Sequence, residues 1–289
     1  MRKALTALVV LAAVLASAAT ASARPAATYA SCAKTDLNLV TSGMLTVGTD
    51  NPAYPPWYGG GSPKGSQWKI NDPSTGKGFE SAVVYAVAKQ LGFQASGVKW
   101  IYTPFDKSYA PGKKSFDFDI NQISYTPARA KVVTFSASYY SVNQAVVVVK
   151  ETKIASVHTI AGLKPFKFGA ALGTTSYSYI TGTIKPSQQP SVFDTNDAAV
   201  LALKNKQIDG LVVDLPTAFY VTAVQVPHSL ILGQFAAAPG GEHFGMVFEK
   251  GNSLAGCVDG ALAKLKANGT LATIQSTWLA KATGAPVLK

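Results

Sequence analysis

Short apolar runs alternate with segments of helical periodicity along most of the chain. Residues 45–49 (LTVGT) form a run rich in β-branched side chains, which is typical of a strand. Residues 145–149 are continuously apolar, which is typical of a strand buried on both faces. The remaining strands are predicted at residues 98–102, 118–123, 167–172, 208–213 and 244–248.

Helices are predicted between these strands. In the first of them, Val83, Val87 and Leu91 recur at helical spacing, and Gly92 follows as a stop signal. The further helices are predicted from residue 127 as a short helix, after residue 174 through residue 180, and at residues 197–206, 253–266 and 271–280.

The alternation of strands and helices predicts an α/β fold whose sheets are parallel and covered on both faces. In such sheets, ligands bind beyond the carboxyl ends of the strands. The polar residues just past predicted strands are therefore the first candidates for a binding site, namely Asp50, Ser124, Thr174, Thr175 and Asp214.

The N-terminus has the pattern of an export signal. Arg2 and Lys3 precede an almost wholly apolar stretch from residue 4 to residue 19, which is shorter than the ~20 residues that span a bilayer. Residues 21–23 (ASA) fit the rule for signal cleavage. We therefore expect residues 1–23 to be a signal peptide rather than a membrane anchor. The mature protein is expected in the periplasm or at the extracellular face of the cell membrane.

The chain has only two cysteines, Cys32 and Cys257. Because an exported protein can keep a disulfide, we expect these two to pair and to tie the start of the mature chain to its C-terminal helix. Lipid attachment at Cys32 is the alternative, since Ala30 and Ser31 suit a lipobox although Tyr29 stands where Leu is usual. So few cysteines exclude a disulfide-rich miniprotein and a four-cysteine zinc site.

The charge pattern argues against nucleic acid as a partner. The 26 Lys and Arg against 15 Asp and Glu give a net charge of +11, but the lysines are scattered and arginine occurs only at Arg2, Arg24 and Arg129. Nucleic-acid-binding proteins usually gather their basic residues on one face. The phosphate-binding, metalloprotease and nucleophile-elbow motifs are missing, and the three histidines share no ligand spacing. We therefore expect no cofactor, no metal and no catalytic residue.

Arg129 is the only arginine in the predicted folded body. A guanidinium binds a carboxylate through two parallel hydrogen bonds, whereas Lys offers only a point charge. Arg129 lies on the short helix that Pro127 opens, where it suits the capture of a small carboxylate. An exposed arginine or a structural ion pair is the alternative. Its polar neighbours in the sequence are Asn121, Gln122, Ser124 and Thr126, the last as N-cap.

Several short motifs follow one another in a defined order. They are LTVGTD at 45–50, YPPW at 54–57, GFE at 78–80, FDFDINQISYTPARA at 116–130, TFS at 134–136 followed by Tyr139 and Tyr140, GTT at 173–175, Asp214, and GTL at 269–271 before Trp278. In order and spacing they resemble the type II periplasmic solute-binding proteins for amino acids, and the resemblance covers about residues 40–282. Each motif is common by itself, but their order behind an export signal is specific.

The resemblance implies two α/β lobes joined by two crossing strands, at residues 143–150 and near residues 242–248. Residues 24–37 would be an N-terminal tail, residues 38–142 and 243–289 the first lobe, and residues 143–242 the second lobe. The ligand would lie in the cleft between the lobes and be enclosed when they close.

The resemblance also implies roles for individual residues. Arg129 would bind the α-carboxylate of an amino acid with help from the Ser124 hydroxyl, and Thr175 would donate to the same group from the start of a helix. Asp214 would bind the α-ammonium group. The other expected pocket residues are Asp50, Tyr54 and Trp57 beside the ligand side chain, together with Asn121, Gln122 and Thr174.

Departures from the family pattern leave the amino acid open. Asn121 and Gln122 stand where the histidine- and basic-amino-acid-binding relatives carry Ser. The segment between Asp50 and Tyr54 is one residue longer than theirs, and the loop at residues 59–75 is longer too. These departures fall on the predicted pocket wall.

The implied function is that of a binding subunit of an ABC-type amino-acid importer. Its partners would be a free amino acid and the membrane permease, and the protein is expected to be a monomer that binds no nucleic acid. The alternative is an enzyme on the same fold, similar to the cyclohexadienyl or arogenate dehydratases, in which Asp50 could serve as the acid. A sensory module that delivers its ligand to a receptor would have the same sequence pattern.

Overall fold

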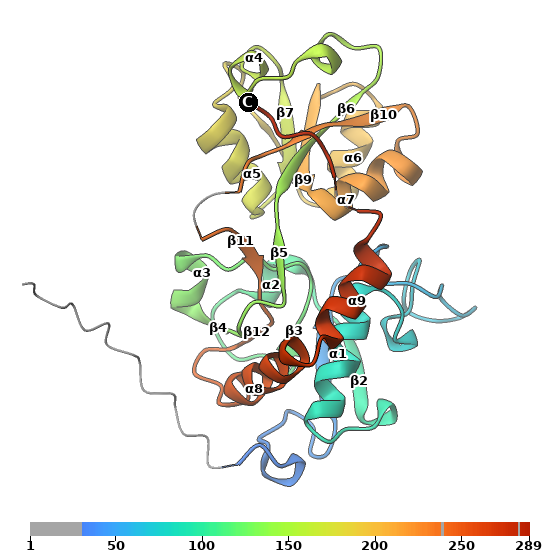
Figure 1. Ribbon diagram of the computed structural model, residues 1–289, viewed down its shortest axis with the longest axis vertical. Coiled ribbons are helices and arrows are strands. Elements are labelled where there is room, and N and C mark those ends of the chain that lie inside the picture. Colours follow the sequence, from blue (N-terminus) through green and yellow to red (C-terminus); the bar gives the residue numbers. More distant parts are fainter. Residues whose placement is uncertain (1–30, 238–239, 283) are drawn as a thin grey trace, which may run out of the picture.

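The computed structural model describes residues 31–237, 240–282 and 284–289, and it forms two lobes (Figure 1). The predicted signal peptide, residues 1–23, lies outside the described residues. Within the described ranges, no helix combines the length and the apolar character needed to cross a membrane.

The first lobe is built on a five-stranded sheet. Its strand β1 pairs in parallel with β2 and β3, whereas β12 returns from the second lobe and runs antiparallel to β3 and β4. The strand order is β2 (Val98–Tyr102), β1 (Leu45–Thr49), β3 (Phe118–Asp119), β12 (Val247–Glu249) and β4 (Val133–Phe135). The helices of this lobe are α1 (Phe79–Gln90), α2 (Phe105–Ser108), α3 (Pro127–Val132), α8 (Leu254–Ala267) and α9 (Thr270–Leu279).

The apolar residues whose spacing predicts α1 form the buried face of that helix. Val83, Val84 and Val87 are fully buried in a core shared with β1, α8 and α9. Gly78 precedes the helix with a φ of 93°, and a Cβ there would lie 2.3 Å from the Tyr58 Cα. Only glycine therefore allows the chain to enter α1 at this point.

The second lobe holds a five-stranded sheet of mixed direction. Strand β6 runs antiparallel to both of its neighbours, while β7 is parallel to β8 and β9. The strand order is β10 (Ser229–Gln234), β6 (Gln144–Val149), β9 (Gly210–Asp214), β7 (Phe168–Ala171) and β8 (Ser191–Phe193). The helices are α4 (Ile160–Leu163), α5 (Thr175–Tyr179), α6 (Asn196–Lys204) and α7 (Leu215–Tyr220), and separate apolar clusters fill the two sides of the sheet.

The expectation of purely parallel sheets is thus wrong for both lobes. Strands β6 and β12 are the exceptions, and each follows a hinge strand. A parallel neighbour requires a crossover connection, usually a helix, and these two strands enter their lobes without one. The remaining strand pairs around β1 and β7 follow the predicted parallel pattern.

Two antiparallel hinge strands lie between the lobes (Figure 1). They are β5 (Tyr140–Val142) and β11 (Glu242–Phe244), and their register places Glu242 opposite Val142. The strand predicted at residues 244–248 is divided between β11 and β12. The division occurs because the Gly245 N–H donates to the Ile123 carbonyl and the Met246 N–H to the Ser136 hydroxyl.

The C-terminal segment departs from the predicted lobe boundaries. Residues 243–289 were assigned to the first lobe, but residues 284–289 cross back to the second lobe after α9 (Figure 1). Val287 bridges to Gln234 at the end of β10, and Leu288 is buried in the second-lobe core. Burial of Leu288 and backbone hydrogen bonds to Gln234 hold this segment in place.

The structure confirms the predicted disulfide between Cys32 and Cys257, whose Cα atoms are 5.5 Å apart. The bond fastens the start of the described chain to α8 across 225 residues of sequence. Because lipid attachment requires a free thiol, the disulfide disfavours lipid attachment at Cys32. A bridge that closes so long a loop typically contributes ~2–4 kcal/mol to stability.

Candidate functional site

A cavity of about 460 Å³ lies between the two lobes and is lined by residues of both. Its position beyond the ends of β1, β7 and β9 agrees with the rule for ligand sites in α/β sheets. The predicted site residues that line it are Asp50, Tyr54, Asn121, Gln122, Ser124, Arg129, Thr174, Thr175 and Asp214. The tenth predicted residue, Trp57, does not line it.

Trp57 is a core residue, so its predicted place beside the ligand is wrong. Its side chain is only 1% exposed and packs edge-on against Phe79, Tyr140 and Phe244. The indole Nε1 donates to the Thr217 hydroxyl at 3.1 Å. An aromatic residue shortly after a strand can lie either in the core or on the pocket wall. Here the aromatic side chains near the hinge bury Trp57 in the core.

Arg129 enters the cavity from α3. Thr126 caps that helix as predicted, because its hydroxyl accepts from the Arg129 backbone N–H at 3.1 Å. The guanidinium donates to the Ser124 carbonyl at 2.7 Å and to the Gly173 carbonyl of the second lobe at 2.8 Å. It also lies 4.3 Å from the centre of the Tyr109 ring.

Burial lowers the Arg129 pKa from its usual value, and the side chain is only 8% exposed. Both alternatives for this residue therefore fail, since it is not exposed and pairs with no carboxylate among the described residues. Two of its five N–H donors are used by the carbonyls, and a further hydrogen bond joins it to Tyr109, so that not all of its donors are used within the protein.

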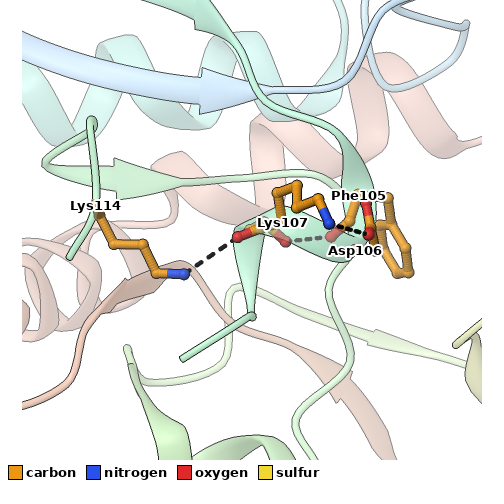
Figure 2. A network of polar contacts seen from close by, with 5 residues as sticks. Phe105, Asp106, Lys107 and Lys114 are labelled. Carbon is orange, nitrogen blue, oxygen red and sulfur yellow. Dashed lines mark hydrogen bonds and ion pairs between the residues drawn. The ribbon is translucent and has the colours of Figure 1, made fainter. Parts of the chain in front are cut away.

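Short α2 carries two residues of the cavity wall, Phe105 and Asp106. Lys107 forms an ion pair with Asp106 at 3.1 Å, and the buried Lys114 ammonium donates to the Lys107 carbonyl at 3.1 Å (Figure 2). Lys114 also donates to the Ala110 carbonyl. These bonds fix the loop that holds Asp106 at the cavity.

Glu242, which sequence reasoning did not select, lies between the Ser124 and Thr175 hydroxyls. Its Oε1 accepts from Ser124 Oγ at 2.5 Å, from Thr175 Oγ1 at 2.6 Å and from Gln144 Nε2 at 3.2 Å. Ser124 comes from the first lobe and Thr175 from the second, so one carboxylate oxygen bridges the lobes. The only sequence signal for this role is the position of Glu242 at the start of the returning hinge strand.

Asp214 caps α7 at the end of β9. It accepts from the Thr217 backbone N–H and from the Thr217 hydroxyl, each at 3.0 Å. Burial raises the Asp214 pKa to about 6. Thr174 has a similar capping role at α5, where its hydroxyl accepts from the Tyr177 N–H. The two caps place Thr174 and Asp214 at the same edge of the second sheet.

The far end of the cavity is acidic. Burial raises the Asp50 pKa, and the charges of Asp106 and Asp197 add to the effect. Across the lobes, the Tyr54 hydroxyl lies 2.6 and 2.7 Å from the two carboxylate oxygens of Asp197. Asp197 was not among the predicted site residues, because in the sequence it reads only as the first turn of α6.

Gln122 contacts both the cavity and the buried Glu80. It lines the cavity, but its backbone N–H donates to Glu80 Oε1 at 2.7 Å and its side-chain amide donates to Glu80 Oε2. Its φ of 51° turns the chain sharply here, so that Asn121 also borders the cavity. Glu80 is completely buried, and burial raises its pKa to about 7.

No group of three or more His, Cys, Asp or Glu that could hold a metal ion occurs in the part of the chain that the structure describes. The cavity wall instead offers one guanidinium and, on other parts of the wall, several carboxylates. Chemically, it suits a small ligand that carries both a carboxylate and more than one cationic group.

Comparison with known proteins defines the family. The sequence pattern of the bacterial extracellular solute-binding proteins, family 3, matches residues 45–281, and the chain belongs to this family. Similar relatives include a probable histidine-binding protein of Campylobacter jejuni, 30% identical over 193 residues that cover 66% of this chain and 71% of the relative. Another is the ABC transporter arginine-binding protein 1 of Escherichia coli, 30% identical over 209 residues that cover 70% and 81%.

Solved structures show the same two-lobe fold. An ancestral arginine-binding protein bound to glutamine is 29% identical, and the superposition gives a TM-score of 0.67. It covers 82% of this chain and 98% of the ancestral protein. The match therefore spans both lobes of the fold described above.

Proposed function

We propose that this protein is the extracytoplasmic binding subunit of an ABC-type amino-acid importer, and that its ligand is an amino acid with a positively charged side chain. One observation carries the choice of ligand. Among the described residues, the cavity is lined by a single arginine and no lysine, but by five aspartates, Asp50, Asp106, Asp194, Asp197 and Asp214.

Electrostatics supports a cationic ligand. Burial raises the pKa values of Asp50 and Asp214, because the ionised carboxylates lose water, and nearby carboxylates add a smaller repulsion, from Asp106 and Asp197 at Asp50 and from Glu242 at Asp214. A ligand with an ammonium group at one end and a second cation at the other would offset this repulsion at both places. An acidic amino acid would add to it.

The positions of the charged residues define an orientation for such a ligand. Arg129 is the only cation that lines the cavity in the part of the chain that the structure describes, so the ligand carboxylate is assigned to it. Asp214 borders the same end from the second lobe and is assigned to the α-ammonium group. Asp50, Asp106 and Asp197 are then the partners of the side-chain cation. Two of the relatives, a histidine-binding and an arginine-binding protein, support this class of ligand, while a glutamine-binding relative shows that the family also accepts a neutral side chain.

Transport fits the arrangement better than catalysis does. A dehydratase needs an acid poised over its substrate. Glu80, whose raised pKa would suit an acid, is completely buried and engaged by Gln122 and Tyr139. Asp50 does line the cavity, but it lies among other carboxylates that a cationic ligand would neutralise. The permease partner and a monomeric state belong to this proposal.

A thermal-shift screen of the chain from residue 24 against the twenty amino acids tests the proposal. A ligand present at ~100 times its Kd stabilises the native state by about 2.7 kcal/mol. We expect shifts with arginine, lysine or histidine, and recovery of the ligand intact by mass spectrometry. Shifts confined to neutral or acidic amino acids would contradict the cationic ligand. Consumption of prephenate or arogenate would replace transport by the enzyme.

A further inference from the structure

A carboxylate of the protein itself is bonded to side chains that line the cavity near Arg129. Glu242 Oε1 accepts hydrogen bonds from the Ser124 and Thr175 hydroxyls, the two groups expected to assist Arg129 in binding the ligand carboxylate. Gln144 Nε2 is a third donor to the same oxygen. Three neutral donors from both lobes therefore converge on one oxygen atom.

Counting donors shows what this contact does to the subsite. A hydroxyl has one hydrogen, so Ser124 and Thr175 have none left to donate while they are bonded to Glu242. A ligand carboxylate is acceptor-only, and it gains nothing from a hydroxyl that can only accept. With Glu242 in place, only the unused donors of Arg129 serve a carboxylate at this end.

Glu242 is held by neutral donors and by no cation of the described residues. No described cation lies within ion-pair distance of it, and its Oε2 is buried without a hydrogen-bond partner among the described residues. The Tyr179 phenol also interacts with Glu242, and burial, followed by the charge of Glu242 and a hydrogen bond to it, raises the Tyr179 pKa. A buried carboxylate oxygen without a partner costs free energy, so the bonded arrangement is not a stable end point.

We propose that Glu242 is an internal competitor for the carboxylate of the ligand and thereby a specificity-determining residue. In the empty protein it occupies the Ser124 and Thr175 hydroxyls and joins the two lobes. An amino acid must displace it before its own carboxylate receives those bonds, whereas an amine without a carboxylate need not. The inference rests on the proposed function, since it requires a ligand that carries a carboxylate.

Matched ligand pairs test the competition. Arginine and agmatine, lysine and cadaverine, and histidine and histamine differ only by the carboxylate. For each pair, calorimetry gives the ratio of the two Kd values in the wild type, in Glu242→Ala and in Glu242→Gln. We expect Glu242→Ala to shift this ratio in favour of the amino acid by at least about tenfold, because hydrogen bonds to a charged group are typically worth that much.

Glu242→Gln tests whether the competition depends on the charge of the Glu242 side chain or on its shape. Its amide oxygen still accepts from the hydroxyls but carries no charge, so the ratio should shift less than in Glu242→Ala. Glu151→Gln is the matched control, because Glu151 is an exposed glutamate just past β6 in the second lobe. It should leave every ratio unchanged. Melting temperatures of all variants show whether they fold, and the glutamine variant carries the test if the alanine variant does not.

The outcomes separate the two proposals. An unchanged ratio in a variant that still binds arginine, lysine or histidine would overturn the competition and leave the proposed function intact. Weaker binding of the amino acid alone would also overturn it, because Glu242 would then be a contact that the ligand needs. If neither the wild type nor Glu242→Ala binds any member of the pairs, the proposed function fails and the inference fails with it.

Discussion

The two ends of the interlobe cavity differ in how their polar groups are paired. At the Arg129 end, the donors and acceptors are largely satisfied within the protein, through Glu242 and two backbone carbonyls. At the Asp50 end, Asp106 is paired with the exposed Lys107, whereas Asp50 and Asp197 have no ion pair among the described residues, and the Tyr54 hydroxyl bridges to Asp197. Under the proposals above, a ligand would exchange hydrogen bonds with the protein at the first end, and its cation would neutralise carboxylates at the second.

This difference shows that the number of charged residues alone does not describe a binding site. Arg129 would be read as an open carboxylate receptor from the sequence. Its neighbours show that part of the receptor is occupied by the chain itself. The acidic end, by contrast, gains its character from residues of both lobes that are far apart in the sequence.

The largest effect on ligand affinity is expected from Arg129→Lys, which changes the first end of the cavity. A lysine cannot reach the Ser124 and Gly173 carbonyls and a ligand carboxylate at once. We expect amino-acid binding to weaken by at least about 2 kcal/mol in calorimetry. Lys131→Ala, an exposed change on the same helix, is the control. Unchanged affinity in Arg129→Lys would sink the assignment of the carboxylate.

Asp197→Asn tests the second end. Removing this charge should weaken arginine binding by about tenfold, while the affinity for glutamine changes little, because only arginine brings a cation to that end. Calorimetry with both ligands gives the comparison. Asp36→Asn, an exposed change outside the cavity, should alter neither affinity. Equal losses for arginine and glutamine would show that Asp197 acts only through the lobe contact with Tyr54.

The pH dependence of binding is expected to report the protonation of Asp214. Burial raises its pKa to about 6 in the empty protein, so Asp214 becomes neutral as the pH falls through that value. Because the α-ammonium group needs the ionised form, affinity should be about tenfold lower at about pH 5 than at about pH 7. The sign for stability also follows. Since the folded state holds this proton more tightly than the unfolded state, ionisation of Asp214 costs stability as the pH rises from about 4 to 6.

Calorimetry across this pH range checks the prediction, with Asp214→Asn as the comparison. That variant should bind more weakly at neutral pH and lose much of the pH dependence. A profile that stays as steep in Asp214→Asn would assign the titration to another carboxylate of the cavity.

The smallest effect on binding is expected from Trp57→Phe, which lies outside both ends. The change removes the bond from the indole to the Thr217 hydroxyl. We expect a loss of about 1 kcal/mol of stability in denaturant unfolding, because a neutral hydrogen bond contributes about that much. The Kd values for arginine and agmatine should both stay the same. A selective loss of arginine affinity would return Trp57 to the binding site.

Local signals made much of the fold predictable. The run at Leu45–Thr49 is β1 with the predicted bounds, and Thr126 caps the start of α3 as expected. These features depend on residues that are neighbours in the chain, where propensity and capping decide the structure. The order of the motifs then indicated two lobes, which the family match and the solved structures support.

What the sequence could not provide depends on contacts between distant residues. Glu242 meets Ser124 across 118 positions, and Asp197 meets Tyr54 across 143. Neither pair shares a local pattern, so nothing in the sequence connects its members. The same reason explains why Trp57 was placed in the pocket and why Leu288 was assigned to the first lobe. In both cases, the apolar surface that buries the side chain belongs to a distant segment.

The last residues of the chain have a practical consequence. Cys32 is bonded to α8 in the first lobe, whereas Val287 and Leu288 are fixed to the second lobe. The two ends of the described chain are therefore attached to different bodies, and any motion about β5 and β11 changes the distance between them. A donor and an acceptor fluorophore fused at the ends of the mature protein would report lobe closure directly, without a label inside the cavity.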